Sequence, residues 1–524
     1  MKKRYNIVLF LLLFLLSAGS GIYFATGLQG FKMLALQLAH GYIVAWFFTF
    51  LNGFISNRTL RTLLNVLVIV PLSVIFLIDL VCIFEFHSNF SEDFIGIMLG
   101  SDPAESSEFL QMHIRGTLFS ILILAALLAA YLPFRKKSIH LPKAVFLLSV
   151  LFLLPCLFLI NVNPAARGNL MAYNTAEGKI NMFFKYMKEM PPDYSPYATP
   201  ADLNIISGQP ENIVLVFGES HCREHCSFFG YDKETMPELR ARMENDNGSV
   251  MAFGHVSSPG VNTSACFKSI MSTYQPEYGD SVQFYTCQTL LQIIRDAGYH
   301  SAWISNQSKR GFYDNVIGNF AELSDTTLFI GDQMSGMYRK NLDEELIPIL
   351  EDYVRKVPDG KNFYVIHLMG SHPEFRDRYP EAFDTFKEED YPDRSVSQRR
   401  LFATYDNSLR YTDYVLSQII RTFEDKETIL VYMSDHGLDF FVSRDDYCAH
   451  SITNDDSVSA IASREVPLIV YTSPLYCQHF PTVCERIQRS SEREFRTDSL
   501  LYTVMDIAGV EFRDSALQHE SLFQ

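Results

Sequence analysis

Carboxylates and histidines directly follow three short apolar runs in this 524-residue chain. The runs and their polar ends are 212–217 with Gly218-Glu219-Ser220, 363–368 with Met369-Gly370-Ser371-His372, and 429–433 with Ser434-Asp435-His436-Gly437. Glutamate, aspartate and histidine brought together form a nitrogen and oxygen donor set that suits zinc or manganese. Glu219 alone is as typical of a helix N-cap, whereas adjacent Asp435 and His436 before a glycine have few purely structural uses.

A sheet is needed to bring these motifs together. From residue 212 onward, apolar β-rich runs alternate with amphipathic segments. Strands are expected at 212–217, 301–305, 363–368, 429–433 and 468–471, and helices at 290–297, 343–357 and 401–424. This alternation predicts an α/β domain with a largely parallel central sheet and helices on both faces. Because ligands of such sheets gather at the carboxyl ends of the strands, the three motifs are expected at one edge.

The composition divides the chain into two parts. The whole chain has a mean hydropathy of +0.04 and a formal charge of −16. Residues 1–165 hold eleven Lys and Arg against seven Asp and Glu, a net +4, which leaves −20 for residues 166–524. An acidic C-terminal part argues against nucleic-acid binding, and the apolar content excludes a disordered chain.

Five apolar stretches in the N-terminal part approach or reach the roughly 20 residues of a membrane-spanning helix. They run over residues 7–25, 33–55, 63–86, 118–134 and 144–159. The first, behind Lys2-Lys3-Arg4, also has features of a cleaved signal peptide. Because four more apolar stretches follow it, a retained first helix is favoured. We therefore expect an α-helical five-span transmembrane domain over residues 1–163.

The charges of the predicted loops indicate the orientation. With a cytoplasmic N-terminus, nine Lys and Arg lie inside and only Lys32 and Arg115 lie outside, as the positive-inside rule requires. Five spans then place residues 211–524 on the external face, which is the periplasm in a Gram-negative inner membrane. Residues 164–210 are expected to hold a helix near 180–190, lying in the membrane interface or packed on the soluble domain, and then an extended linker. Asp79, near the outer end of the third span, is either functional or simply solvated.

The ordered set of motifs resembles the membrane-anchored phosphoethanolamine transferases of Gram-negative bacteria, members of the alkaline phosphatase/sulfatase superfamily. The resemblance covers essentially the whole chain. The matching stretches are 212–220 with Phe229-Gly230-Tyr231 and Met236-Pro237, Met369–His372 with Arg378-Tyr379-Pro380, Tyr405–Asp413, and Ser434–Gly437. It implies a periplasmic catalytic domain of the sulfatase type over residues 211–524.

The resemblance implies a catalytic metal and a nucleophile. Carried over residue by residue, Glu219, Asp435 and His436 are ligands of a zinc ion, with manganese as an alternative. Thr263 is both the fourth ligand and the nucleophile, because a metal lowers the pKa of an alcohol enough to make it reactive. Ser264 is the competing nucleophile.

Four further residues match family positions around the transferring group. His372 and His450 face the phosphoryl group, where they can protonate the leaving alcohol or hold a second metal. Asn306 and Lys309 fall in a segment that contacts the phosphoethanolamine headgroup, and either is a candidate to bind a phosphate oxygen.

The implied reaction is transfer of phosphoethanolamine from phosphatidylethanolamine to lipopolysaccharide, on a lipid A phosphate or a core sugar, through a phosphoethanolamine-threonine intermediate. On lipid A this would reduce negative charge and weaken the binding of cationic antimicrobial peptides. Rival interpretations are a phosphoglycerol transferase, a sulfatase-type hydrolase, and a non-catalytic membrane sensor or scaffold. The missing Cys-x-Pro-x-Arg signature counts against a sulfate hydrolase, and intact Glu219, Thr263, Asp435 and His436 count against a scaffold.

Seven of the nine cysteines fall in the predicted external domain, where disulfides are permitted and where relatives use several. The short loop between Cys477 and Cys484 favours their pairing, and an odd total leaves at least one thiol over. A separate cluster, His221-Cys222-Arg223-Glu224-His225-Cys226, has metal-binding residue types. Four ligands on one helical turn cannot all face one ion, so a packing role is favoured.

Overall fold

The chain forms two compact units in the computed structural model. The structure describes residues 5–23, 27–87, 113–161, 176–189, 201–245, 249–275, 284–309, 316–330, 341–357, 359–445, 448–451 and 454–523, with isolated residues in 90–110 and 277–282. The first unit consists of Met1–Ile95 and Leu110–Glu189, and the second of Gly96–Phe109 and Met190–Gln524.

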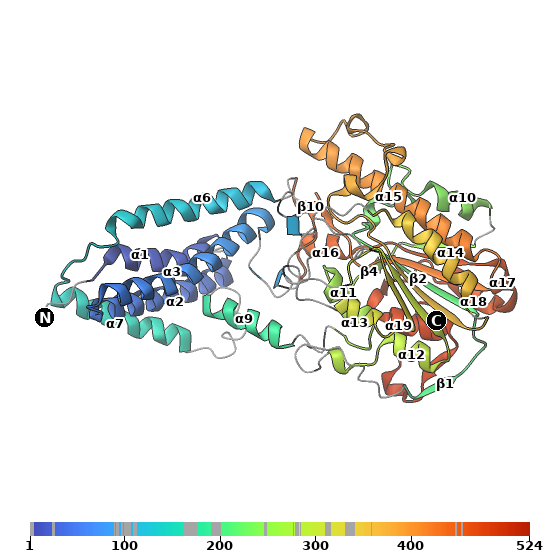
Figure 1. Ribbon diagram of the computed structural model, residues 1–524, viewed down its shortest axis with the longest axis horizontal. Coiled ribbons are helices and arrows are strands. Elements are labelled where there is room, and N and C mark those ends of the chain that lie inside the picture. Colours follow the sequence, from blue (N-terminus) through green and yellow to red (C-terminus); the bar gives the residue numbers. More distant parts are fainter. Residues whose placement is uncertain are drawn as a thin grey trace. The chain divides into compact units, whose positions relative to one another are not determined.

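The first unit is helical (Figure 1). Its described helices are α1 (Ile7–Ala18), α2 (Gly27–Phe54), α3 (Arg58–Val81), α6 (Ile114–Tyr131), α7 (Lys143–Asn161) and α9 (Ala176–Glu189). Three helical stretches are long and apolar enough to cross a membrane, namely Phe31–Phe54, Arg58–Phe86 and Ile114–Phe134, while Ile7–Gly21 and Lys143–Leu159 are apolar but shorter. A membrane domain is therefore supported, and the count of five spans stays a prediction.

Apolar side chains lie both inside and outside this helical unit. Leu9, Leu13 and Leu16 of α1 pack in a buried cluster with Phe76 of α3 and Tyr131 of α6. Large apolar residues also point outward along α6 and α7, and the most exposed of them, Leu122, Leu148, Leu154 and Phe158, are 62–66% exposed. An apolar outer surface of this extent suits contact with lipid and not with water.

A buried ion pair ties α9 to α3. Lys179 of α9 and Asp79 of α3 are each less than 10% exposed, and the Lys179 ammonium contacts both carboxylate oxygens of Asp79. Ser20 also donates a hydrogen bond of 2.8 Å to Asp79 Oδ2, and Gln37 donates one of 3.1 Å to Ser20. The interpretation of Asp79 as a simply solvated residue is therefore wrong, since helix α9 brings a lysine to it from 100 residues further along the chain.

Replacing Lys179 by Met leaves the Asp79 carboxylate buried and unpaired. We expect Lys179→Met to lower the free energy of unfolding by about 3–5 kcal/mol, the usual cost of breaking a buried pair. The double variant Asp79→Asn/Lys179→Met should recover most of this loss because no buried charge remains. Thermal unfolding of the full-length protein in detergent measures both effects.

The matched control is Lys32→Met, which removes an exposed lysine of α2 and should change stability by less than about 0.5 kcal/mol. A Lys179→Met protein as stable as this control would contradict the role assigned to the ion pair.

The second unit is built on a seven-stranded sheet (Figure 1). In spatial order the strands are β3 (Val250–Phe253), β11 (Leu468–Thr472), β8 (Thr428–Ser434), β2 (Asn212–Gly218), β7 (Asn362–His367), β5 (His300–Ser305) and β6 (Thr326–Phe329). All neighbours from β8 to β6 are parallel, while β11 runs antiparallel to both β8 and β3. The prediction of a largely parallel α/β sheet is confirmed, with an antiparallel edge.

Helices cover both faces of the sheet because its strands are apolar on both sides. Along β2, Ile213, Leu215 and Phe217 enter one core cluster, and Val214 and Val216 enter the other. The first cluster includes residues of α11 (Thr263–Ile270), α12 (Leu290–Asp296), α13 (Val316–Ala321), α18 (Pro481–Arg489) and α19 (Leu500–Ile507). The second includes residues of α10 (Pro237–Asn245), α14 (Leu346–Lys356) and α15 (Val396–Phe423). Continuous burial of this kind is what a parallel sheet requires.

The predicted linker differs in extent from the structure. Residues 162–175 and 190–200 lie outside the described part of the chain, and the helix between them is α9. Within the stretch expected to be extended linker, β1 (Leu203–Ile205) pairs antiparallel with β13 (Val510–Phe512). The linker therefore ends before Leu203, because this segment gains backbone hydrogen bonds from a strand some 300 residues away. The remaining domain boundaries stay predictions.

The cysteines of the second unit form one disulfide among the described residues. Cys477 of α17 (Pro474–His479) is bonded to Cys484 of α18, with Cα atoms 5.8 Å apart, which confirms that pairing. Among the described residues of this unit, Cys222, Cys226, Cys266 and Cys448 lie outside the disulfide and are buried.

Candidate metal centre and active site

Two neighbouring strands place the acidic residues together. β2 and β8 pair in parallel with Gly218 opposite Ser434, so the next residues, Glu219 and Asp435, emerge side by side. The Asp435 amide donates to the Gly218 carbonyl at 3.3 Å. Ser220 has φ +55, an uncommon conformation for a residue with a side chain, and it turns the chain sharply after Glu219.

Four side chains converge at this edge. His436 Nε2 lies 3.2 Å from Glu219 Oε1 and 3.5 Å from Asp435 Oδ2. The Thr263 hydroxyl lies 3.1 Å from Glu219 Oε2 and 3.3 Å from His436 Nε2. Glu219, Asp435 and His436 are each at most 2% exposed. The structure therefore brings together all four residues predicted as metal ligands.

The spacing of these donor atoms fits a tetrahedral zinc site. With zinc bonds of 2.0–2.2 Å, ligand atoms at the corners of a tetrahedron lie about 3.3–3.6 Å apart. The distances of 3.1–3.5 Å between neighbouring donors approach this range. Asp435 Oδ2 is also buried with no hydrogen-bond partner among the described residues, as expected of an oxygen that coordinates a cation. Glu219, Asp435 and His436 are the group that the described residues offer to a metal ion.

The two buried carboxylates of the centre favour a positive charge beside them. Burial acts to raise the pKa of the Glu219 carboxyl, but the positive charge of His436 and its hydrogen bond hold that pKa well below the usual range. Burial and the neighbouring Glu219 carboxylate raise the pKa of Asp435 to about 7. Burial lowers the pKa of His436, yet the two carboxylates outweigh it and raise the pKa to about 10. A proton on His436 thus supplies the positive charge that a metal ion would provide.

Thr263 is held at the start of α11. Asn262 is the N-cap of this helix and accepts a 2.9 Å hydrogen bond from the Ala265 amide through its side chain. The Thr263 hydroxyl therefore lies at a helix N-terminus, whose partial positive charge favours a developing alkoxide. Among the described contacts, it is the hydroxyl of Thr263 and not of Ser264 that reaches Glu219 and His436.

Both predicted histidines lie near the centre. The ring of His450 meets that of His436 edge-on, with centroids 5.4 Å apart. Burial and then the charge of His436 lower the pKa of His450 to about 3, which favours a neutral imidazole. His372 interacts with the charge of Glu219, and Arg378 holds its loop by donating a 3.0 Å hydrogen bond to the His372 carbonyl.

The two residues predicted to bind the headgroup have other described partners. The Asn306 amide is fully buried and donates to Asp343 Oδ1 at 2.7 Å and to the Asn341 carbonyl at 3.1 Å. The ammonium of Lys309 lies 3.2 Å from Glu322. The printed sequence does not reveal these partners, since Asp343 and Glu322 come from other elements.

Gln307 is a site residue that sequence reasoning missed. Its side-chain amide donates to Glu219 Oε2 at 3.3 Å and to the Leu368 carbonyl at 3.0 Å, and so joins the ligand to the end of β7. Its position in the sequence could have indicated this role, because Gln307 follows β5 at the same edge of the sheet.

Asp343 holds the loop after β7 by accepting hydrogen bonds from the amides of Met369 and Gly370. Gly370 has φ +53, and a Cβ there would lie 2.7 Å from the Glu219 amide, so a larger residue would displace the ligand.

The His221–Cys226 cluster does not form a metal site in the described structure. Its side chains have separate surroundings: His221 contacts the Tyr432 hydroxyl at 2.9 Å, Cys222 accepts from the Leu438 amide at 3.1 Å, His225 lies 2.7 Å from Asp406, and Cys226 is buried in the core. The packing role favoured from the sequence agrees with this arrangement.

This chain is similar to known proteins in both sequence and fold. The profile of the sulfatase family matches residues 211–510, which is more than half of the chain and contains every residue of the centre. The chain belongs to the sulfatase family. The resemblance inferred from the sequence is thereby confirmed at the level of this superfamily.

Curated relatives within the sulfatase family are named phosphoethanolamine transferases. The chain is 26% identical to phosphoethanolamine transferase EptC of Escherichia coli strain RS218 over 461 residues, which cover 82% of this chain and 76% of the relative. It is 28% identical to EptA of Salmonella typhimurium over 318 residues, which cover 59% of this chain and 55% of that protein.

Solved structures of sulfatase-family proteins share the fold. The integral membrane protein EptA from Neisseria meningitidis matches with a TM-score of 0.70 at 19% identity, covering 98% of this chain and 96% of that chain. The periplasmic domain of EptC from Escherichia coli in complex with zinc matches with a TM-score of 0.54 at 23% identity, covering 62% of this chain and 88% of that one. The arrangement of a membrane domain followed by a sulfatase-like domain is therefore a shared architecture.

Removing the Gln307 amide should loosen Glu219 and weaken metal binding. We expect Gln307→Leu to raise the Kd for zinc by about 10–100-fold, the usual effect of losing a partner that orients a ligand. Titration of zinc into the full-length protein, in competition with a chelator, measures this change.

Gln209→Leu serves as the control, because Gln209 also bridges two groups but precedes the start of β2, at the opposite end of the strands from the centre. Equal zinc affinities for the two variants would show that Gln307 does not position Glu219.

Proposed function

We propose that this protein transfers phosphoethanolamine from phosphatidylethanolamine to lipopolysaccharide, onto a lipid A phosphate or a core sugar. The observation that carries the proposal is the Thr263 hydroxyl at 3.1 and 3.3 Å from two of the three buried candidate ligands. The names of the EptC and EptA relatives support phosphoethanolamine as the group that is transferred. The likeness to a full-length membrane transferase supports a membrane-bound enzyme.

In the first half-reaction, Thr263 Oγ1 attacks the phosphorus of the donor lipid. A bond forms between this oxygen and phosphorus while the bond from phosphorus to the diacylglycerol oxygen breaks. The Thr263 hydroxyl donates its hydrogen bond to Glu219 Oε2, which orients the oxygen lone pairs of Thr263 for the attack. Zinc, or manganese in its place, would be held by Glu219, Asp435, His436 and Thr263, and would lower the pKa of the alcohol and offset the phosphoryl charge.

His372 and His450 serve the leaving and entering oxygens. The diacylglycerol oxygen needs a proton as it departs, and His372 is the better candidate to supply it, because the low pKa of His450 favours its neutral form. In the second half-reaction the acceptor oxygen attacks the same phosphorus and Thr263 is released. A neutral His450, favoured by its low pKa, suits ligation of a second metal. Asn306 and Lys309 remain candidates for binding a phosphate oxygen.

Membrane anchoring suits this reaction, because donor and acceptor are both lipids of one leaflet. We infer a five-span inner-membrane topology with the N-terminus in the cytoplasm and the catalytic domain, residues 211–524, in the periplasm. The support is the asymmetry of loop charges together with the three long apolar helices and the two shorter ones.

The second candidate is transfer of phosphoglycerol by the same chemistry. The four residues at the centre handle only the phosphoryl group, so they do not distinguish ethanolamine from glycerol. The names of the curated relatives favour ethanolamine.

Substituting Thr263 should abolish transfer. We expect Thr263→Ala to lower the rate by about a thousandfold or more, because the nucleophile is lost, while Thr263→Ser retains part of the activity. Mass spectrometry of lipopolysaccharide from cells that express each protein measures the phosphoethanolamine adduct.

Ser264→Ala is the matched control and should modify lipopolysaccharide like the wild type. An adduct that persists with Thr263→Ala and disappears with Ser264→Ala would assign the nucleophile to the neighbouring residue. Absence of an adduct with the wild type would contradict the proposed acceptor.

A further inference from the structure

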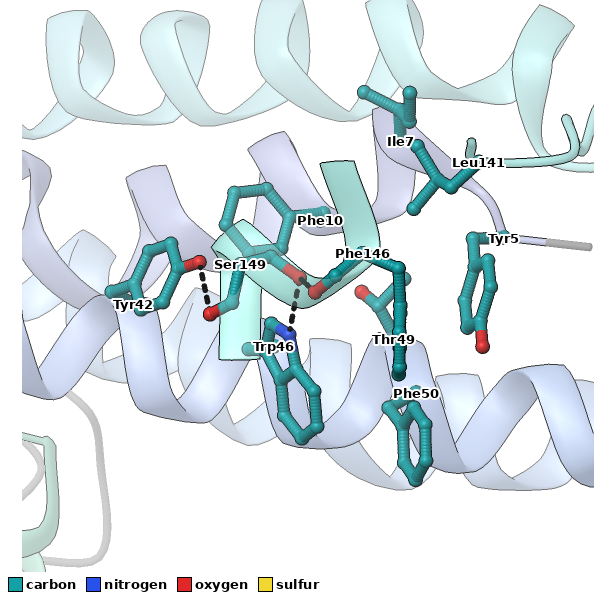
Figure 2. A pocket seen from close by; sticks show the side chains of 10 residues that line it. All are labelled: Tyr5, Ile7, Phe10, Tyr42, Trp46, Thr49, Phe50, Leu141, Phe146 and Ser149. Carbon is teal, nitrogen blue, oxygen red and sulfur yellow. Dashed lines mark hydrogen bonds between the residues drawn. The ribbon is translucent and has the colours of Figure 1, made fainter. Parts of the chain in front are cut away.

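A cavity of about 220 Å³ lies between α1, α2 and α7 of the first unit (Figure 2). Six aromatic side chains line it, namely Tyr5, Phe10, Tyr42, Trp46, Phe50 and Phe146. Sites for drug-sized ligands usually measure about 300–1,000 Å³, so this cavity is too small for a whole lipid. Its size and walls suit a single hydrocarbon chain.

The polar atoms of the lining are mostly engaged with one another. The Tyr42 hydroxyl donates to the Ser149 carbonyl at 3.0 Å, and Trp46 Nε1 donates to Ser149 Oγ at 3.2 Å, as Figure 2 shows. The Thr49 hydroxyl, in contrast, is buried and has no hydrogen-bond partner among the described residues. The cavity therefore offers apolar walls and a buried hydroxyl that can donate to a ligand.

The lining residues of α2 extend over most of one leaflet of a bilayer. Tyr42 and Phe50 lie eight residues apart on α2, and a rise of 1.5 Å per residue places them about 12 Å apart along the helix. One leaflet occupies about half of a hydrocarbon core of roughly 30 Å. A chain in this cavity would thus run along most of one leaflet.

Positive charge gathers at the end of the cavity near Tyr5. Tyr5 exchanges two backbone hydrogen bonds of 2.9 Å with Ile139, and Asn6 donates to the Arg135 carbonyl at 3.3 Å, so the segment 134–141 runs past this end. The exposed basic residues of the same loop and of the neighbouring helix starts are Arg58, Arg61, Arg135, Lys136, Lys137 and Lys143. The sequence holds no Asp or Glu in 5–78 or 113–161 to offset them.

We propose that this cavity binds an acyl chain of an anionic phospholipid whose phosphate contacts the basic segment Arg135–Lys137. The aromatic walls enclose the chain, and the Thr49 hydroxyl donates a hydrogen bond to the ester carbonyl. The predicted topology places this end in the cytoplasmic leaflet, so the lipid is distinct from the donor proposed for the reaction. The positive-inside rule alone accounts for the charges but not for a chain-sized cavity beside them.

Tryptophan fluorescence provides a direct test, because the chain has only two tryptophans. Trp46 lines the cavity, whereas Trp303 is fully buried in the sheet of the second unit. The full-length protein is placed in phosphatidylcholine vesicles that contain increasing fractions of phosphatidylglycerol or phosphatidylcholine with brominated chains. A Trp46→Phe protein supplies the background from Trp303. We expect half-maximal quenching of Trp46 at a fraction of brominated phosphatidylglycerol about fivefold or more below that of brominated phosphatidylcholine.

Two variants separate the contributions of charge and cavity. Replacing Arg135, Lys136 and Lys137 together by Gln should make the two lipids equal, while Lys32→Gln, which removes an exposed lysine of a different segment, should retain the preference. Ile7→Phe fills the cavity from a side chain that is already 40% exposed, and it should reduce quenching by both lipids.

Equal quenching by the two brominated lipids in the wild type would overturn the proposal. A preference that survives the triple substitution would equally overturn it.

Discussion

The active centre depends on the cost of burying two carboxylates side by side. Glu219 and Asp435 emerge from adjacent parallel strands and are at most 2% exposed, so their charges repel with little help from water. A positive charge beside them stabilises this arrangement, and the protonated His436 or a metal ion can supply that charge. The fixed register of β2 and β8 thus creates a site that favours a cation, and in the proposed mechanism that cation would activate Thr263.

The same principle operates in the helical unit, where the surroundings are apolar. Asp79 is tolerated there because Lys179 of α9 pairs with it and Ser20 donates a further hydrogen bond. In the second unit the buried carboxylates form a candidate metal site, whereas here the carboxylate holds a helix in place. The contrast arises from the partner: a lysine of the same unit satisfies Asp79 permanently, while Asp435 keeps an oxygen without a hydrogen-bond partner among the described residues.

The sequence predicted the elements that depend on local pattern, and the positions of the candidate ligands at their ends. Apolar runs followed by polar motifs located β2, β7 and β8, and with them Glu219, Asp435 and His436. It did not predict interactions that depend on distant partners. Gln307 reaches Glu219 only because β5 lies beside β7, and Asn306 is drawn to Asp343 from another loop. The antiparallel direction of β11 and the pairing of β1 with β13 likewise arise from contacts that no local spacing encodes.

The most direct test of this account is to trap the phosphoethanolamine group on Thr263 of the enzyme. The full-length protein is incubated with phosphatidylethanolamine or phosphatidylglycerol in the absence of an acceptor, digested, and analysed by mass spectrometry. The account predicts a phosphoethanolamine group on Thr263 with the first lipid and no adduct with the second. A group on Ser264, or a phosphoglycerol adduct formed from phosphatidylglycerol, would contradict it.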